Sequence, residues 1–371
     1  MDAGLPLGVY ISIPFCSQKC TYCNFASGVF PADLLEEYLA ALDAELEAEG
    51  WEVLPDTLYL GGGTPSLLKN EALERILAWL PAVEWKEATI EAAPGTVNAA
   101  RAGFWNQQGL DRVSLGVQSF VAGEISATGR KHSAEMVERE VGILGQAGFS
   151  KINIDLIAGL PYQTEGSWRE SLEWVERLAP PHVSVYMLEA DQESRLGREI
   201  VRGGTRWGAG AVPEEGQIAE FYHQAVERLG AMGIHRYEIS NFARAGFESL
   251  HNLKYWRRQP YRGFGADAHS FDGRWRRANV QTAGEYVERG RGRVSPLRSA
   301  EEVSAQQASE ERFFLGLREV AGIEPSEGEW RRFAGPIGRL SEQGLLDREG
   351  RTLMLTERGI LFSNEVFAEF V

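Results

Sequence analysis

The chain has 371 residues, of which 43% are hydrophobic and 25% are charged. This ordinary composition excludes wholesale disorder, and the length allows one large domain with a smaller one beside it. The formal net charge of -15 argues against broad binding to nucleic acid, because phosphates attract basic surfaces.

Targeting signals are absent from the sequence pattern. No run approaches the roughly eighteen apolar residues of a membrane span. The N-terminal sequence MDAGLPLGVYI lacks a basic region followed by a long apolar stretch. We therefore expect a cytoplasmic protein without a transmembrane segment, and peripheral contact with a membrane stays open.

Short apolar runs alternate with longer helical patterns in the first half of the chain. We predict strands at 8–13, 57–60, 88–92, 111–116, 152–157 and 182–188. The helix after Pro31 places leucines on one side and acids on the other, and it ends at Gly50. Repeated strand and helix units predict parallel strands with right-handed crossovers. The fold class is therefore α/β, with a partial (β/α)6 barrel over residues 1–200.

The pattern changes after about residue 200. A glycine-rich loop and a helix near 214–230 precede irregular, aromatic and arginine-rich sequence, which we take as a barrel extension over 201–295. From 296 to 371 we expect an α+β C-terminal domain, in which LLDREGRTLML forms a small hairpin after a helix. This module resembles a winged helix. The acidic charge favours a packing role for it over a role in nucleic-acid binding.

All three cysteines fall within eight residues, as Cys16, Cys20 and Cys23 in a C-x3-C-x2-C pattern. Their odd number and tight spacing argue against disulfides. A structural zinc site needs a fourth ligand, and the nearest histidine is His132. A [4Fe-4S] cluster held by three thiolates leaves one iron open for another ligand, and this is the interpretation we prefer.

Three glycines, Gly61 to Gly63, follow the second predicted strand and precede Thr64 and Pro65. Glycines let the backbone approach a ligand closely and expose its polar groups. Taken alone, the segment could equally be a tight turn.

With Tyr22 directly before the last cysteine, the cysteine segment resembles the radical S-adenosylmethionine (SAM) superfamily. The resemblance implies that the cysteines hold the cluster and that SAM chelates the fourth iron through its amino and carboxylate groups. It also implies that Gly62, Gly63 and Thr64 bind the SAM amino group. One electron, from a donor such as flavodoxin or ferredoxin, would then split SAM into a 5′-deoxyadenosyl radical.

Further positions resemble the oxygen-independent coproporphyrinogen oxidase family and its haem-chaperone branch. Tyr10 and Tyr22 match aromatic residues beside the cluster. The resemblance implies that Arg130 pairs with the SAM carboxylate and that the remaining matches hold the amino-acid and ribose ends, namely Glu91, Gln118 and Asp155. Each of these polar residues, seen alone, is more often a cap or part of a surface ion pair.

The resemblance continues through residues 237–243, 251–256 and 261–271. In HNLKYW (251–256), His251 is a candidate haem ligand. A structural histidine beside Asn252 and Trp256 is the alternative, and the sequence leaves both open. GFGADA (263–268) partly fits a dinucleotide fingerprint, but no clean βαβ context surrounds it, so we expect close backbone packing there.

Arginines crowd the region from 257 to 293, interleaved with Tyr261, Phe264 and Trp275. Guanidinium groups suit propionates and aromatic rings suit a planar ring, so the region fits a tetrapyrrole. A solvated face and contact with RNA are the alternatives. The arginines are those at 257, 258, 262, 274, 276, 277, 289, 291 and 293.

Two departures separate the chain from the oxidase pattern. Phe25 stands where the oxidases have a further cysteine, and only nine residues precede Tyr10. We therefore predict a haem chaperone that binds a [4Fe-4S] cluster, SAM and haem and passes the haem to an acceptor protein. The alternatives are a coproporphyrinogen III dehydrogenase and a radical methylase of tetrapyrroles. No catalytic residue is assigned, and use of the radical stays open.

Overall fold

The computed structural model describes residues 7–371. Residues 1–6 lie outside the described residues. They belong to the N-terminal segment for which the sequence predicts no targeting signal. The six predicted strands of the first half are confirmed, each within about two residues of its expected bounds. They are β1 (Leu7–Ile13), β2 (Pro55–Gly62), β3 (Glu87–Ala92), β4 (Arg112–Gln118), β5 (Lys151–Ala158) and β6 (His182–Met187).

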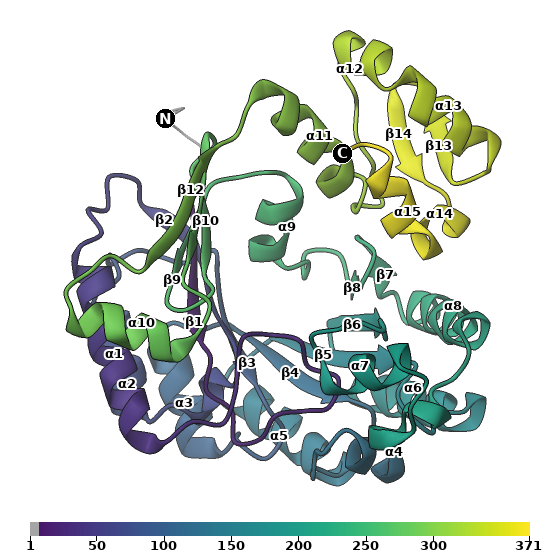
Figure 1. Cartoon of the computed structure of the whole chain (residues 1–371). Helices are drawn as coiled ribbons and strands as arrows, with labels where there is room; N and C mark the ends of the chain where they lie inside the picture. Colours follow the sequence, from purple (N-terminus) through teal and green to yellow (C-terminus); the bar gives the residue numbers. More distant parts are fainter. Residues whose placement is uncertain (1–6) are drawn as a thin grey trace.

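Helices follow these strands and lie on the outer side of the curved sheet, as Figure 1 shows. They are α1 (Ala32–Glu47), α2 (Asn70–Leu77), α3 (Ala99–Gln107), α4 (Ala122–Ala127), α5 (Ala134–Gln146) and α6 (Glu165–Leu178), with a short 3-10 turn η1 (Pro65–Leu67). Neighbouring strands from β1 to β6 pair in parallel in chain order. The predicted partial (β/α)6 barrel is confirmed.

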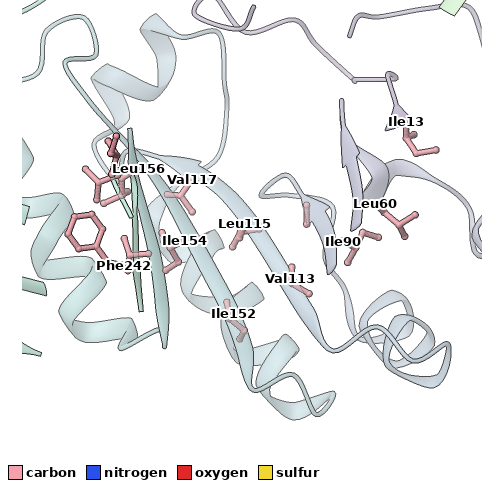
Figure 2. Close-up of a cluster of buried hydrophobic side chains, with 14 of the residues drawn as sticks. Ile13, Leu60, Ile90, Val113, Leu115, Val117, Ile152, Ile154, Leu156 and Phe242 are labelled. Carbon is pink, nitrogen blue, oxygen red and sulfur yellow. The ribbon is translucent and has the colours of Figure 1, made fainter. Parts of the chain in front are cut away.

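The outer face of this sheet is apolar. Alternate residues of each strand, such as Ile11, Leu60 and Ile154, are fully buried against the helices. Figure 2 shows these side chains in a row across the strands, from Ile13 to Leu156. This face forms the main core.

The inner face is polar, which is unusual because parallel sheets are normally apolar on both faces. Asn153 of β5 donates to Ser114 of β4 at 2.8 Å and to Ser184 of β6 at 3.0 Å. Its Oδ1 meets Nδ1 of His182 at 2.6 Å, and Ser184 donates to Asn241 at 2.8 Å. A hydrogen-bonded wall of this kind suits a barrel interior that receives a polar ligand.

The sequence after residue 200 is more regular than we expected. Short strands extend both edges of the barrel sheet, so the expectation of irregular sequence up to 295 is wrong. They are β7 (His235–Arg236), β8 (Asn241–Ala243), β9 (Tyr261–Phe264), β10 (His269–Phe271), β11 (Trp275–Asn279) and β12 (Leu297–Glu302). Among the described residues, twelve strands form one sheet, in the order β12-β11-β10-β9-β1-β2-β3-β4-β5-β6-β8-β7. Its edges are β12 and β7, so in this order the sheet does not close.

The helices of this part include the predicted one near 214–230. They are α7 (Arg195–Val201), η2 (Arg206–Ala211), α8 (Glu215–Ala231), α9 (Leu250–Trp256) and α10 (Ala283–Arg291). Figure 1 shows α9 above the sheet, on the side from which β2 to β4 start. It contacts β2 through the hydrogen bond between Thr57 Oγ1 and His251 Nδ1.

The C-terminal segment forms the predicted hairpin after a helix. Its elements are α11 (Ala305–Gly316), α12 (Glu327–Arg332), α13 (Ala334–Glu342), β13 (Leu346–Glu349), β14 (Thr352–Leu355), α14 (Glu357–Leu361) and α15 (Ser363–Ala368). The winged-helix resemblance and the division at residues 200 and 295 stay predictions. Over residues 7–371, no helix combines the length and hydropathy needed to cross a membrane.

Candidate metal and cofactor site

The loop that carries the three cysteines follows β1 and is closed at its base. Phe15 and Gly28 form an isolated bridge, and Cys16 N-H donates to the Gly28 carbonyl at 2.8 Å. Farther along, Thr21 N-H donates to the Thr128 carbonyl at 3.2 Å, and its carbonyl accepts from Leu196 N-H at 2.8 Å. The barrel and α7 therefore hold this loop at the carboxyl end of the strands, where parallel folds bind ligands.

All three cysteines are free thiols and half-buried, so no disulfide forms. Burial raises the pKa of the Cys16 thiol, whereas hydrogen bonds from Thr64 and Ser27 oppose that rise. Lys19 Nζ lies 3.5 Å from Cys23 Sγ. A cation and hydroxyl donors beside the sulfurs are the surroundings that stabilise thiolates.

The donor set fits a [4Fe-4S] cluster. Within residues 7–371, no three Cys, His, Asp or Glu side chains converge where they could hold a single metal ion. A cubane cluster makes a different demand, because each thiolate binds a different iron and the sulfurs stay apart. Three soft thiolates on one anchored loop satisfy that demand and leave one iron for another ligand.

The glycine loop lies directly against the cysteine loop. Gly63 N-H donates to the Ile13 carbonyl at 2.8 Å, and Thr64 N-H donates to the Phe15 carbonyl at 2.9 Å. A Cβ on Gly63 would stand 2.8 Å from those same backbone atoms. Gly62 has φ +106°, which side-chain-bearing residues rarely adopt. Close approach and conformation therefore both require glycine, and the tight-turn alternative does not account for the contact.

Glu91, at the end of β3, faces the glycine loop. Its carboxylate accepts from Gly62 N-H at 3.0 Å and from the Tyr59 hydroxyl at 2.9 Å. Burial, with the neighbouring charge of Asp155, raises the pKa of Glu91 to about 7 despite these two bonds. The carboxylate can therefore hold or release a proton near neutral pH, beside backbone that a ligand can reach.

Gln118 and Arg130 meet over Gly116 of β4. Gln118 has φ 72°, an uncommon conformation for a residue with a side chain, and a Cβ on Gly116 would lie 3.0 Å from its amide nitrogen. Arg130 Nη1 donates to the Gly116 carbonyl at 2.5 Å. Its Nε is buried without a hydrogen-bond partner among the described residues, and Tyr22 and Cys20 lie beside it. A guanidinium with an unused donor suits a ligand carboxylate.

Asp155 and Tyr10 complete the predicted set. Asp155 accepts from Asn153 at 2.7 Å and from Ser114 at 3.1 Å, and burial raises its pKa. The Tyr10 ring stacks on Tyr59, with centroids 6.1 Å apart. Nine residues other than the cysteines are predicted to bind the cofactors. Thr64 lies in the glycine loop described above, and the other eight also lie at this end of the barrel: Tyr10, Tyr22, Gly62, Gly63, Glu91, Gln118, Arg130 and Asp155.

Sequence reasoning missed residues at the mouth of this site. A small hollow is lined by Tyr10, Ser12, Pro14, Phe25, Ala26, Ser27, Gly62 and Asp267. Asp267 has φ 57°, a left-handed conformation that the sequence pattern does not predict, so only the structure identifies Asp267 as part of this hollow. The close packing predicted for 263–268 is confirmed, because a Cβ on Gly265 would stand 2.8 Å from the Ser12 carbonyl.

His251 lies at the other end of the barrel. It is fully buried, Nδ1 pairs with Thr57 Oγ1 and Nε2 pairs with the Tyr255 hydroxyl, both at 2.9 Å. Burial lowers its pKa to about 3. Since neither ring nitrogen is free for iron, the geometry favours the structural alternative for His251.

Most arginines of the 257–293 region meet carboxylates. Arg257 pairs with Glu319, and Arg258 and Arg276 both pair with Glu311, each at 2.8 Å. Arg258 also lines a separate cavity of about 590 Å³, together with Arg262 and Arg274, and Arg262 pairs with Glu49 at 3.4 Å. Most guanidinium groups of this region are therefore paired within the chain, and the two pairs with Glu311 join the region to α11.

Comparisons with known proteins agree with this geometry. The model of the radical SAM superfamily matches residues 10–175. The heme chaperone HemW of Bacillus subtilis (strain 168) is 34% identical over 98% of both chains. HemW of Escherichia coli (strain K12) is 36% identical over 71% of this chain and 70% of that one. Coproporphyrinogen III oxidase (HemN) from Escherichia coli, a radical SAM enzyme, shares the fold, with a TM-score of 0.86 and 22% identity over 99% of this chain and 90% of that one. The chain therefore belongs to the HemW family of the radical SAM superfamily.

Proposed function

We propose that the chain is a haem chaperone, which binds a [4Fe-4S] cluster through Cys16, Cys20 and Cys23, binds SAM beside it, and delivers haem to an acceptor protein. The observation that carries this proposal is the end-to-end likeness to proteins named heme chaperone, at 34% identity over 98% of both chains. The exposed Phe25, where the oxidases have a further cysteine, also supports it.

The residues around the cysteine loop have distinct tasks in this proposal. Arg130 donates to the SAM carboxylate through its unused Nε. Gly62 and Gly63 let the backbone approach the amino group, and Glu91 accepts a proton or a hydrogen bond there. Asp155 and Gln118 suit the hydroxyl and amide contacts of the ribose and amino-acid ends. A bound cluster supplies one electron at a time and an open coordination position for SAM.

The test is haem binding and transfer by the reconstituted protein. We expect about one haem per chain, with a shifted Soret band, and passage of that haem to apomyoglobin as a probe acceptor. Haem binding at no fixed stoichiometry, or haem that never leaves the protein, would contradict the proposal. We place this activity in the cytoplasm, where thiols stay reduced and available to iron.

The rival activity is decarboxylation of coproporphyrinogen III by a dehydrogenase with the same cofactors. An anaerobic assay with SAM, a reductant and coproporphyrinogen III separates the two. Formation of protoporphyrinogen over many turnovers would favour the dehydrogenase. SAM cleavage alone does not discriminate, because a chaperone can retain residual cleavage.

The haem ligand is tested separately. Because both nitrogens of His251 are hydrogen-bonded, we expect a His251→Gln protein to bind haem with an unchanged Soret band. A band that weakens or moves in the variant would restore His251 as the iron ligand.

A further inference from the structure

The segment from Asp191 to Trp207 forms a basic surface beside the cysteine loop. Leu196 N-H donates to the Thr21 carbonyl at 2.8 Å, and the Arg195 guanidinium donates to the Lys19 carbonyl. Two guanidinium groups contact the Trp207 ring, with Arg195 at 4.9 Å and Arg206 at 5.4 Å from its centroid. These contacts make the segment continuous with the loop that carries the cysteines.

The exposed arginines of this surface make no ion pairs with the described residues, and Lys19 beside them lies 3.5 Å from Cys23 Sγ. We call Lys19, Arg198, Arg202, Arg206 and Trp207 the basic patch. None of its four cations makes an ion pair with any acidic group of residues 7–371, in contrast to most arginines of the 257–293 region. The three arginines and Trp207 are exposed.

Two of the three acids in the same segment, Asp191 and Glu199, are half-buried and accept hydrogen bonds from backbone N-H groups. Asp191 accepts from Glu193 and Ser194 N-H groups, both at 2.7 Å, and Glu199 accepts from Arg206 N-H at 3.3 Å. Within residues 191–207, Glu193 is the one acid that is exposed and accepts no hydrogen bond at its carboxylate. Residues 191–207 contain four arginines and three acids, and Lys19 adds one more cation, so this surface has a small positive excess in a chain of net charge -15.

We propose that the basic patch is the docking surface for an acidic electron-carrier protein, an inference that rests on the proposed cluster. The reduced carrier gives up one electron and is oxidised, and the cluster gains that electron and is reduced, with no proton transferred. Two observations favour such a partner over others: the patch is bonded to the cysteine loop, so a docked carrier sits close to the cluster, and its charge complements an acidic protein. Exposed Trp207 and arginines are residue types common at the centres of interfaces.

The experiment uses a reduced plant-type ferredoxin, an acidic one-electron carrier, as the probe. The variant is Arg198→Glu/Arg202→Glu/Arg206→Glu, and the control reverses three exposed cations elsewhere, Lys69→Glu/Arg139→Glu/Arg351→Glu. The control cations also make no ion pair within residues 7–371. Both triple variants change the net charge equally, so only the position of the charge differs.

Two measurements are made at low salt. The first is ferredoxin binding to the protein without cluster, which we expect to weaken at least about tenfold in the patch variant and much less in the control. The second is the rate of cluster reduction by ferredoxin, which should fall at least as much, lose its dependence on salt, and leave reduction by dithionite unchanged.

Each outcome has one meaning. Equal ferredoxin binding and equal reduction rates in both triple variants would overturn the docking proposal while leaving the cluster intact. A wild-type protein that binds no iron would instead overturn the proposed function, and dithionite reduction would then be undetectable. A patch variant that reacts slowly with dithionite as well would show damage to the cluster site and would also count against docking.

Discussion

The two ends of the barrel use buried charge in opposite ways. At the amino end, the Glu87 carboxylate accepts from Arg112 Nε at 2.9 Å and from Ser249, Leu250 and His251 at the start of α9. Arg112 in turn donates to the carbonyls of residues 247 and 248. These two charged side chains hold the start of α9 at the amino end of the barrel.

At the carboxyl end, polar groups are left for something outside the chain. Glu91 accepts from two donors, whereas Glu87 accepts from four. Each end keeps one buried guanidinium nitrogen without a partner among the described residues, Arg130 Nε here and Arg112 Nη1 at the amino end, so the contrast lies in how fully the carboxylates are bonded. The uncommon φ of Gln118 lies at this end too, as expected where backbone strain accompanies function. The contrast indicates that the same barrel is completed by its own helix at one end and by a ligand at the other.

The largest effect should come from the loop at the carboxyl end. Cys20→Ser removes one of three thiolates, so we expect reconstituted protein to lose nearly all of its cluster iron while its folding is unchanged. Iron content and visible absorbance measure the first, and far-ultraviolet circular dichroism measures the second. A variant that retains the wild-type iron count would refute the assignment of the cluster to these cysteines.

The next effect belongs to the amino end. Arg112→Ala leaves the fully buried Glu87 carboxylate without its cation, and breaking a buried pair in this way costs about 3–5 kcal/mol of unfolding free energy. Urea denaturation of the protein without cluster measures the loss. Iron uptake on reconstitution should stay at the wild-type level. A loss below about 1 kcal/mol would show that α9 does not depend on this pair.

The third prediction concerns Glu91 and pH. Its folded pKa of about 7 lies above the ordinary value of 4.5, so it stabilises the fold fully below pH 4.5 and this contribution is lost as pH rises through 7. Relative to Glu91→Gln, the wild type should therefore lose on the order of 1–3 kcal/mol between pH 4.5 and 8. Asp155 titrates in the same sense and is present in both proteins, but its charge interacts with Glu91, so the measured difference belongs to the Glu91–Asp155 pair. Parallel pH profiles would contradict the raised pKa.

The sequence predicted the barrel because its signal is local. Alternation such as Val9, Ile11 and Ile13 on one face of β1 is legible within a few residues, and each strand repeats it. The candidate site was predictable for the same reason: its residues follow strand ends, and parallel strands bring those ends together.

The rest of the fold depends on contacts that no local pattern contains. β12 reads LRSAEE and is exposed throughout, so only its pairing with β11 makes it a strand. His251 bonds to Thr57, which lies 194 positions away in the sequence. The motif HNLKYW by itself does not distinguish a structural histidine from an iron ligand. Asp267 lines the hollow beside Tyr10 with a left-handed backbone conformation, which its residue type does not predict.

The smallest predicted effect comes from His251→Gln, which tests the two hydrogen bonds of the buried His251 ring. Near pH 7 the variant should lose about 1 kcal/mol, because glutamine replaces only part of the two hydrogen bonds. The folded pKa of about 3 lies below the ordinary 6.5, so the wild type loses stability as pH falls from 6.5 toward 3, while glutamine does not titrate.

The deficit of His251→Gln should therefore shrink or reverse by about pH 4.5, because the native histidine must stay neutral in a fully buried site while the unfolded one takes up a proton. His182, buried and shifted in the same direction, is common to both proteins. An exposed histidine, His235→Gln, serves as the control and should leave the urea midpoint unchanged at both pH values. A deficit that stays constant between pH 7 and pH 4.5 would mean that His251 takes up a proton equally in the folded and unfolded states, and it would contradict the lowered pKa at this end of the barrel.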